Sequence, residues 1–290
     1  MDTLCKKYGY TPDKEKIDRS LEIIAANLEN VISPDVLKEC FSIMDVTTLH
    51  TDDTVASVSR LVDKVNSLAK DFPEYPRPAS VCVYPNFASV VAERRADPRV
   101  HVTAVSSCFP TAQSFLEVKV RECELAVEAG ADEIDIVLAL NSFLAGDYDS
   151  ASREIREMKA AVDRKAAEAG RTVILKVILE TGLLVTPEKI AEASFLAMEA
   201  GADFIKTSTG KVSVNATPVS AYVMCECIKA FYEKTGRKVG FKAAGGISNP
   251  SDALIYYLLH KKILGKEITN NQNFRIGASR LTSQLFKFLS

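Results

Sequence analysis

Short apolar runs rich in β-branched residues recur along the chain, and longer amphipathic stretches separate most of them. Runs of this kind predict buried strands, whereas the stretches between them carry apolar residues at helical spacing. The alternation predicts βα units on a parallel sheet. We expect eight strands, over Ile43–Leu49, Ser80–Tyr84, Val100–Ser106, Glu133–Leu138, Val173–Leu179, Phe204–Ser208, Val239–Lys242 and Phe274–Gly277.

Several of the helices expected between these strands begin with Ser, Thr or Asn followed by Pro, the residue favoured at the first helical position. Eight strands alternating with helices over about 250 residues predict an α/β fold of the TIM (β/α)8 barrel type. A doubly wound sheet is disfavoured, because no Gly-x-Gly-x-x-Gly follows the first strand. The expected helices include Ser114–Ala129, Ser150–Ala169, Pro187–Ala200, Val219–Tyr232 and Pro250–Leu258.

Residues 1–40 precede the first strand and predict a helical extension, and residues 41–290 form the barrel domain. Five apolar residues there fall at helical spacing, and Ser33-Pro34 begins a second helix. We expect this extension to pack on the barrel and cover its floor. A partner-binding arm is the alternative, since the apolar face must pack on something. The five residues are Ile17, Leu21, Ile24, Leu28 and Val31.

Composition narrows the possible partners and the compartment. The chain has a formal net charge of −2, and no segment concentrates Lys and Arg, so neither nucleic acid nor an anionic membrane is an expected partner. It shows no signal-peptide pattern and no apolar run long enough to span a bilayer. Seven scattered cysteines favour reduced thiols in a cytoplasmic protein. A small molecule is the expected partner.

Nothing in the spacing of histidines, cysteines and acids predicts a metal site. The one close cysteine pair, Cys225 and Cys227, lies in a helical pattern, where residues two apart face different ways. His50, His101 and His260 are far apart in the sequence. We therefore expect chemistry that uses neither a metal nor a cofactor.

Charged residues interrupt four apolar strands that are neighbours in the predicted barrel: Asp135, Lys176, Lys206 and Lys242. A single charge in a strand usually faces solvent. However, both faces of a parallel barrel are covered, and burying an unpaired charge costs several kcal/mol. Three lysines and an aspartate on adjacent strands therefore indicate a functional cluster.

Two adjacent lysines suggest a specific reaction. A lysine attacks a carbonyl only when it is neutral, and neutrality at pH 7 requires about 4 kcal/mol of destabilisation of the ammonium. A second ammonium about 5 Å away supplies about 3 kcal/mol at an effective dielectric of about 20, and desolvation adds to this. We expect one lysine to form a Schiff base, another to keep it deprotonated, and Asp135 to transfer protons.

Loops of small residues follow the last three strands, at 208–211, 244–248 and 277–280. Glycines and serines let backbone N–H groups approach an anion, and the last two loops occupy the usual phosphate position of a TIM barrel. Ordinary βα turns are the alternative. Gly210-Lys211 does not form a P-loop, because Val212 follows it.

These residues resemble deoxyribose-phosphate aldolase, a family of metal-independent class I aldolases. The resemblance runs from about residue 40 to near the C-terminus, and FIKTSTGKVSVNATP, residues 204–218, is its most specific segment. Further matching segments are MDVTTL at 44–49, VCVYP at 81–85, ADEIDIV at 131–137, LKVILETG at 175–182, GFK at 240–242 and GAS at 277–279.

The resemblance implies a TIM barrel that reversibly cleaves 2-deoxy-D-ribose 5-phosphate to acetaldehyde and glyceraldehyde 3-phosphate, in deoxyribose catabolism. It implies that Lys206 forms the Schiff base, Lys242 lowers the pKa of Lys206, and Asp135 relays protons. Asp45 and Lys176 support that relay, and a homodimer is the implied assembly. The implied substrate-binding residues are Cys82, Thr207, Gly210, Lys211, Gly245, Gly246, Gly277 and Ser279.

The chain departs from the family pattern at three turns and at its end. Ala243 replaces a proline, Ala112 a glycine and Arg280 a serine, and the chain ends at Ser290 without the terminal tyrosine of some relatives. These departures keep open a barrel with weakened aldolase activity whose main role is protein interaction. A Schiff-base aldolase for a different sugar phosphate is a third possibility.

Overall fold

Parallel strands form the centre of the molecule. The structure is a computed structural model that describes residues 3–279 and 281. Within these residues eight parallel strands close into a barrel in chain order, which confirms the TIM-barrel prediction. The strands are β1 (Met44–Thr47), β2 (Ser80–Val83), β3 (His101–Val105), β4 (Glu133–Val137), β5 (Ile174–Ile178), β6 (Phe204–Lys206), β7 (Gly240–Ala244) and β8 (Phe274–Ala278).

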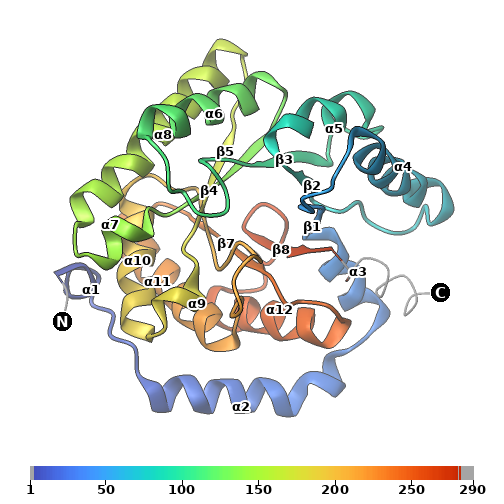
Figure 1. Ribbon diagram of the computed structural model, residues 1–290. Coiled ribbons are helices and arrows are strands. Elements are labelled where there is room, and N and C mark those ends of the chain that lie inside the picture. The colour runs from blue at the N-terminus through green and yellow to red at the C-terminus, as the bar shows by residue number, and fades with distance from the viewer. Residues whose placement is uncertain (1–2, 280, 282–290) are drawn as a thin grey trace.

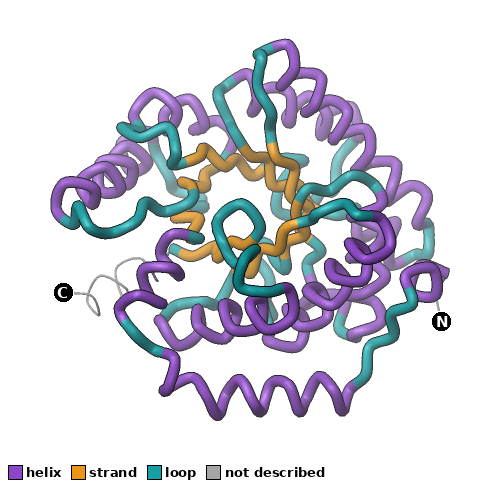
Figure 2. Tube along the Cα trace, turned by 180° about the vertical axis from the view of Figure 1, so that it is seen from behind, coloured by secondary structure: helices purple, strands orange, loops and turns teal. Residues whose placement is uncertain are grey.

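Helices surround the ring of strands, as Figure 2 shows from behind. The helices between the strands are α4 (Val55–Asp71), η1 (Pro85–Phe87), α5 (Ala88–Arg94), α6 (Leu116–Glu128), α7 (Leu140–Leu144), α8 (Tyr148–Glu168), α9 (Thr181–Leu184), α10 (Pro187–Glu199), α11 (Pro218–Thr235) and α12 (Pro250–Leu264). Polar caps begin α10, α11 and α12 as expected. For example, the Thr186 side chain accepts a hydrogen bond from the Lys189 N–H, and Pro187 follows it.

The N-terminal extension consists of α1 (Thr3–Tyr8), α2 (Lys14–Val31) and α3 (Pro34–Ser42). It packs outside the barrel: α1 contacts α10 and α11, while α2 runs along α11 and α12 (Figure 1). Tyr8 stacks on Phe195 with ring centroids 4.6 Å apart, and Ile17 and Ile24 are buried. The apolar face of α2 is therefore covered by the chain's own outer helices, not placed under the strands as a floor.

Alternation along each strand divides the buried residues into two sets. Val81, Ile134, Val177 and Ile276 belong to the main apolar core with the helices. The alternate positions form the barrel interior, where polar and charged side chains gather. Thus the period of two places the lysines in the interior.

Close packing in the interior requires a glycine on β7. A Cβ atom added to Gly240 would lie 2.3 Å from the ring of Phe204 on β6. These two residues are register partners. The absent side chain therefore leaves room for the aromatic ring beneath the charged cluster.

Candidate active site

Within the described part of the chain, seven buried charged side chains occupy the barrel interior. Strand register brings several of them together: Asp135 is paired with Lys176, and Lys206 with Lys242. Each is at most 3% exposed. The strands β1, β4, β5, β6, β7 and β8 contribute, in order, Asp45, Glu133 with Asp135, Lys176, Lys206, Lys242 and Arg275.

Asp135 is at the centre of the cluster. Its Oδ2 lies 2.9 Å from Lys206 Nζ and 2.8 Å from Lys242 Nζ. Its Oδ1 lies 2.7 Å from Lys176 Nζ. Three lysines from three consecutive strands therefore share one carboxylate, and the candidate nucleophile lies beside the candidate proton-transfer group.

A lower layer of the cluster contains two residues that the sequence analysis missed, Glu133 and Arg275. Arg275 Nη2 lies 2.6 Å from Glu133 Oε1, and its Nη1 lies 2.8 Å from Asp45 Oδ1. Glu133 Oε2 also lies 2.5 Å from Lys176 Nζ. Among the described residues, the interior thus holds three carboxylates, those of Asp45, Glu133 and Asp135.

The two adjacent lysines differ in their electrostatics. Burial, reinforced by Lys242 and opposed by Asp135, lowers the pKa of Lys206. Burial also disfavours the charge of Lys242, but Asp135 and Asp45 outweigh it and raise the pKa of Lys242. Lys242 Nζ lies 2.5 Å from Asp45 Oδ2. One lysine is thus driven toward the neutral amine while its neighbour is held as the ammonium.

The central carboxylate remains ionised. Burial opposes its charge, but Lys176, Lys206 and Lys242 together hold the pKa of Asp135 well below its usual range. A carboxylate with three cationic neighbours can accept a proton when one of those neighbours loses its charge.

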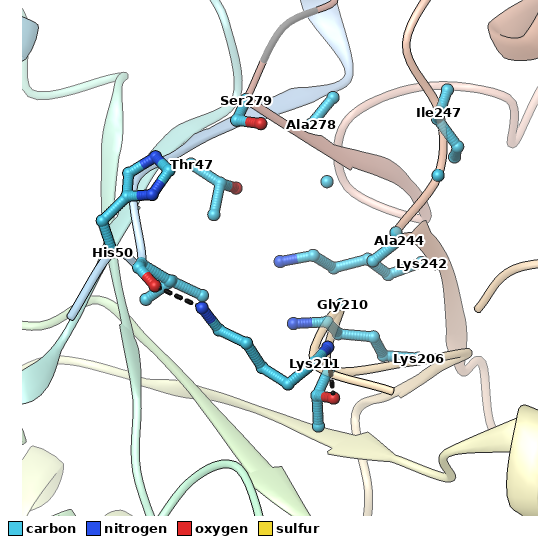
Figure 3. Close-up of a pocket in the computed structure, with 15 residues that line it drawn as sticks. Thr47, His50, Lys206, Gly210, Lys211, Lys242, Ala244, Ile247, Ala278 and Ser279 are labelled. Carbon is cyan, nitrogen blue, oxygen red and sulfur yellow. Dashed lines mark hydrogen bonds between the residues drawn. The ribbon is translucent and has the colours of Figure 1, made fainter. Parts of the chain in front are cut away.

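A cavity of about 220 Å³ opens above the two lysines at the carboxyl ends of the strands. Figure 3 shows Lys206 and Lys242 side by side with their nitrogens directed into it. Both glycine loops predicted for phosphate and the Gly210-Lys211 turn contribute to its wall. The lining residues are Thr47, Leu49, His50, Lys206, Thr209, Gly210, Lys211, Lys242, Ala244, Gly245, Gly246, Ile247, Gly277, Ala278 and Ser279.

Lys211 crosses one side of this cavity. Its Nζ lies 2.5 Å from the backbone oxygen of Leu49, in the loop after β1 (Figure 3). The turn that carries it is held by Glu180, which accepts hydrogen bonds from the N–H of Thr209 at 3.1 Å and from its Oγ1 at 2.5 Å. The buried carboxylate of Glu180, which follows β5, thus positions the turn that carries the Lys211 cation after β6.

The glycines of the loop after β7 allow a close approach. Gly245 has a φ of 86°, and a Cβ there would lie 2.7 Å from the side chain of Asn215. A larger residue would therefore clash as well as strain the backbone.

Cys82 and Thr207 do not line the cavity. The Thr207 Oγ1 accepts a hydrogen bond from the Ala244 N–H at 3.0 Å, so this hydroxyl joins β6 to β7. Cys82 is buried on β2, in an apolar cluster with Leu49 and Val105. Burial raises the pKa of its thiol. His50, Thr47 and Thr209 line the cavity instead, although no strand pattern singled them out.

The departures noted in the sequence are only partly within the described residues. Ala112 has a φ of 53°, a left-handed conformation that glycine adopts more readily. Ala243 is buried on the helix-facing side of β7, away from the cluster. Arg280 and the C-terminal residues 282–290 lie outside the described part of the chain.

The cluster and the cavity together have the features of an enzyme site, with two lysine nitrogens directed into an open pocket. In residues 3–279 and 281, no group of three or more His, Cys, Asp or Glu side chains is placed to hold a metal ion. None of the helices in that part of the chain is long and apolar enough to cross a membrane.

Comparisons with known proteins identify the family. Residues 40–273 match the DeoC/LacD family aldolase profile, and the chain belongs to this family. Deoxyribose-phosphate aldolase from Homo sapiens is 40% identical over 259 residues, covering 86% of this chain and 79% of its own. A Caenorhabditis elegans protein provisionally named for the same activity is 39% identical over 289 residues, covering 99% and 92%.

A solved structure also matches. The tetrameric deoxyribose phosphate aldolase from Aeropyrum pernix has a TM-score of 0.67 at 26% identity, covering 96% of this chain and 99% of its own.

Proposed function

We propose that the protein is a class I aldolase that reversibly cleaves 2-deoxy-D-ribose 5-phosphate to acetaldehyde and D-glyceraldehyde 3-phosphate. The observation that carries this proposal is a buried lysine with a lowered pKa, Lys206, whose nitrogen faces the cavity 2.9 Å from Asp135. Two relatives named for this activity support the substrate.

The proposed cleavage begins when the neutral Lys206 amine adds to the aldehyde carbon C1. The C1 oxygen takes up a proton from the Lys242 ammonium and leaves as water, which gives an iminium ion. A base removes the proton of the C3 hydroxyl. The C2–C3 bond breaks, its electron pair moves toward the iminium nitrogen, and glyceraldehyde 3-phosphate departs. The remaining enamine takes a proton at C2, and hydrolysis releases acetaldehyde and the free amine.

Asp135 and Lys242 are suited to the proton transfers of this sequence. Asp135 Oδ2 contacts both nitrogens, so it can accept a proton near Lys206 and return it through Lys242. Lys176 forms an ion pair with Asp135, and Asp45 forms one with Lys242. Their proposed role is to fix Asp135 and Lys242 in place.

The phosphate of the substrate is proposed to bind at the far end of the cavity. Lys211 can leave the neutral Leu49 carbonyl for a dianion, since a charged partner forms the stronger bond. The residues proposed to surround the phosphate are Gly210, Lys211, Gly245, Gly246, Gly277 and Ser279, whereas Cys82 and Thr207 are proposed to support the wall behind them.

Two further proposals concern the setting of the reaction: a cytoplasmic location, which rests on the scattered cysteines, and a homodimer, which rests on the family resemblance. Light scattering of the purified protein tests the second. Neither the site nor the comparisons favour the alternative of a protein-interaction barrel with weakened activity.

Borohydride trapping tests the function directly. The protein is incubated with deoxyribose 5-phosphate, reduced with sodium borohydride and digested, and the adduct is mapped by mass spectrometry. We expect one adduct at Lys206 and none in Lys206→Met. Lys14→Met, which changes an exposed lysine of α2, is the matched control and should be trapped like the wild type. An unmodified wild-type Lys206, or an adduct elsewhere, overturns the proposal.

A further inference from the structure

The charged cluster extends below the groups that reach substrate. Arg275 contacts two carboxylates, Asp45 and Glu133, and its guanidinium lies over the ring of Phe204 at 5.7 Å. It is 2% exposed. Its Nε donates a hydrogen bond to the backbone oxygen of Asn271 at 2.5 Å, and it does not line the cavity. Arg275 therefore has no direct part in binding or chemistry, but it contacts Asp45 and Glu133, which pair with Lys242 and Lys176.

The charges of this cluster do not balance when every group is ionised. In the described part of the chain, three carboxylates face four bases. The carboxylates are Asp45, Glu133 and Asp135, and the bases are Lys176, Lys206, Lys242 and Arg275. A net buried charge is costly, so one base should lose its proton.

Contacts within the cluster indicate which base that is. Lys176 bonds Glu133 and Asp135, and Lys242 bonds Asp45 and Asp135. Lys206 has a single carboxylate partner among the described residues, Asp135, which it shares with both. Arg275 does not deprotonate in proteins. The least compensated titratable cation is therefore Lys206.

We propose that Arg275 is a positioning residue that sets the number of protons bound by the cluster. Because Arg275 keeps its positive charge, one other base in the interior must lose a proton, and that base is Lys206. The proposal rests on the proposed function, since it explains how the Schiff-base lysine becomes neutral. Glu133 has the opposite effect, because its negative charge partly neutralises the positive charge of Arg275 and favours the protonated form of Lys206.

Side chains on the neighbouring strands contribute to the charge balance around Lys206 and around Glu133. Lys206 is surrounded by Asp135 on β4, Lys242 on β7 and the Cys82 thiol on β2. Glu133 is also contacted from β3, where Thr103 Oγ1 donates at 3.0 Å and His101 Nδ1 lies 2.7 Å from Oε1. The His101 imidazole adds a charge to the count only when it is protonated. The side chain of His101 is 39% exposed, so this ring connects the cluster to solvent.

Charge-changing variants of the lower layer test the proposal. Acetaldehyde, which lacks a phosphate, is the probe, and cyanoborohydride trapping at Lys206 is measured against pH for Arg275→Met, Glu133→Gln and the double variant. Removing the cation should raise the midpoint of the trapping curve by about 1 pH unit, and removing the anion should lower it by about 1 unit. The double variant should return near the wild type.

A structural role alone would lower the yield without moving the midpoint in opposite directions. Unchanged midpoints, or shifts of the same sign, overturn the proposal. If Arg275→Met does not fold, the downward shift in Glu133→Gln decides alone. His101→Gln is the control, and a midpoint that disappears in this variant assigns the titration to the imidazole and refutes the inference. A wild type that gives no Lys206 adduct refutes the proposed function itself, and the inference with it.

Discussion

Replacing Lys242 by methionine isolates the electrostatic effect of the second lysine on the first. The change removes an ammonium that shares Asp135 Oδ2 with Lys206 and keeps an unbranched side chain of similar length. Two ammonium groups about 5 Å apart repel by about 3 kcal/mol at an effective dielectric of about 20. At 1.36 kcal/mol per unit, that repulsion lowers the pKa of Lys206 by roughly 2 units.

The trapping rate falls in Lys242→Met because only the neutral amine of Lys206 reacts with the aldehyde. Without Lys242 the pKa of Lys206 rises, so less free amine is present at any pH below it. The trapping rate at pH 7 should therefore fall about 100-fold, and raising the pH by about 2 units should restore most of it. Freeing Asp135 to bond Lys206 more strongly acts in the same direction.

The assay is the initial rate of adduct formation with acetaldehyde and cyanoborohydride across the pH range. Lys14→Met serves again as the control and should match the wild-type curve. A loss in Lys242→Met that is equal at every pH would refute the electrostatic reasoning. It would indicate that Lys242 acts by geometry or by carrying protons.

Three other substitutions test separate parts of the structure. Lys211→Met should raise the KM for the phosphorylated substrate about tenfold or more, by loss of a charge-assisted bond, while acetaldehyde trapping is unchanged; steady-state kinetics measures both. Gly240→Ala should destabilise the fold by about 1–3 kcal/mol in urea unfolding, because its Cβ would overlap the Phe204 ring. Ala112→Gly should raise stability by up to about 1 kcal/mol in the same assay, since φ there is 53°, and a loss of stability would contradict this.

The fold and the upper layer of the site could be predicted from the sequence because both depend on periodicity. A period of two along a strand puts Lys206 on the same face as Phe204, and neighbouring strands in a barrel bring such faces together. The sequence analysis grouped Asp135, Lys176, Lys206 and Lys242 as one cluster on adjacent strands, and the structure buries all four together.

The lower layer was not predicted, although Glu133 has the same strand parity as Asp135. Parity tells which face a side chain occupies but not how deep it lies or which strand it meets across the barrel. That depends on the register, which pairs Lys242 with Arg275 and Thr103 with Glu133. Similarly, the contact of Lys211 with Leu49 joins loops 162 residues apart and leaves no periodic signal.

The buried cluster is better explained by chemistry than by stability. Apolar side chains of similar volume would stabilise the interior as well or better, whereas removing one partner of a buried ion pair is costly. Each carboxylate of the cluster bonds at least two cations, so none is left unpaired. The shortage of negative charge affects Lys206 most, because this cavity-lining lysine pairs with Asp135 alone among the described carboxylates. In the proposed mechanism, an imbalance that would destabilise the fold elsewhere in the barrel lies where a substrate carbonyl can reach Lys206, and it supplies the nucleophile.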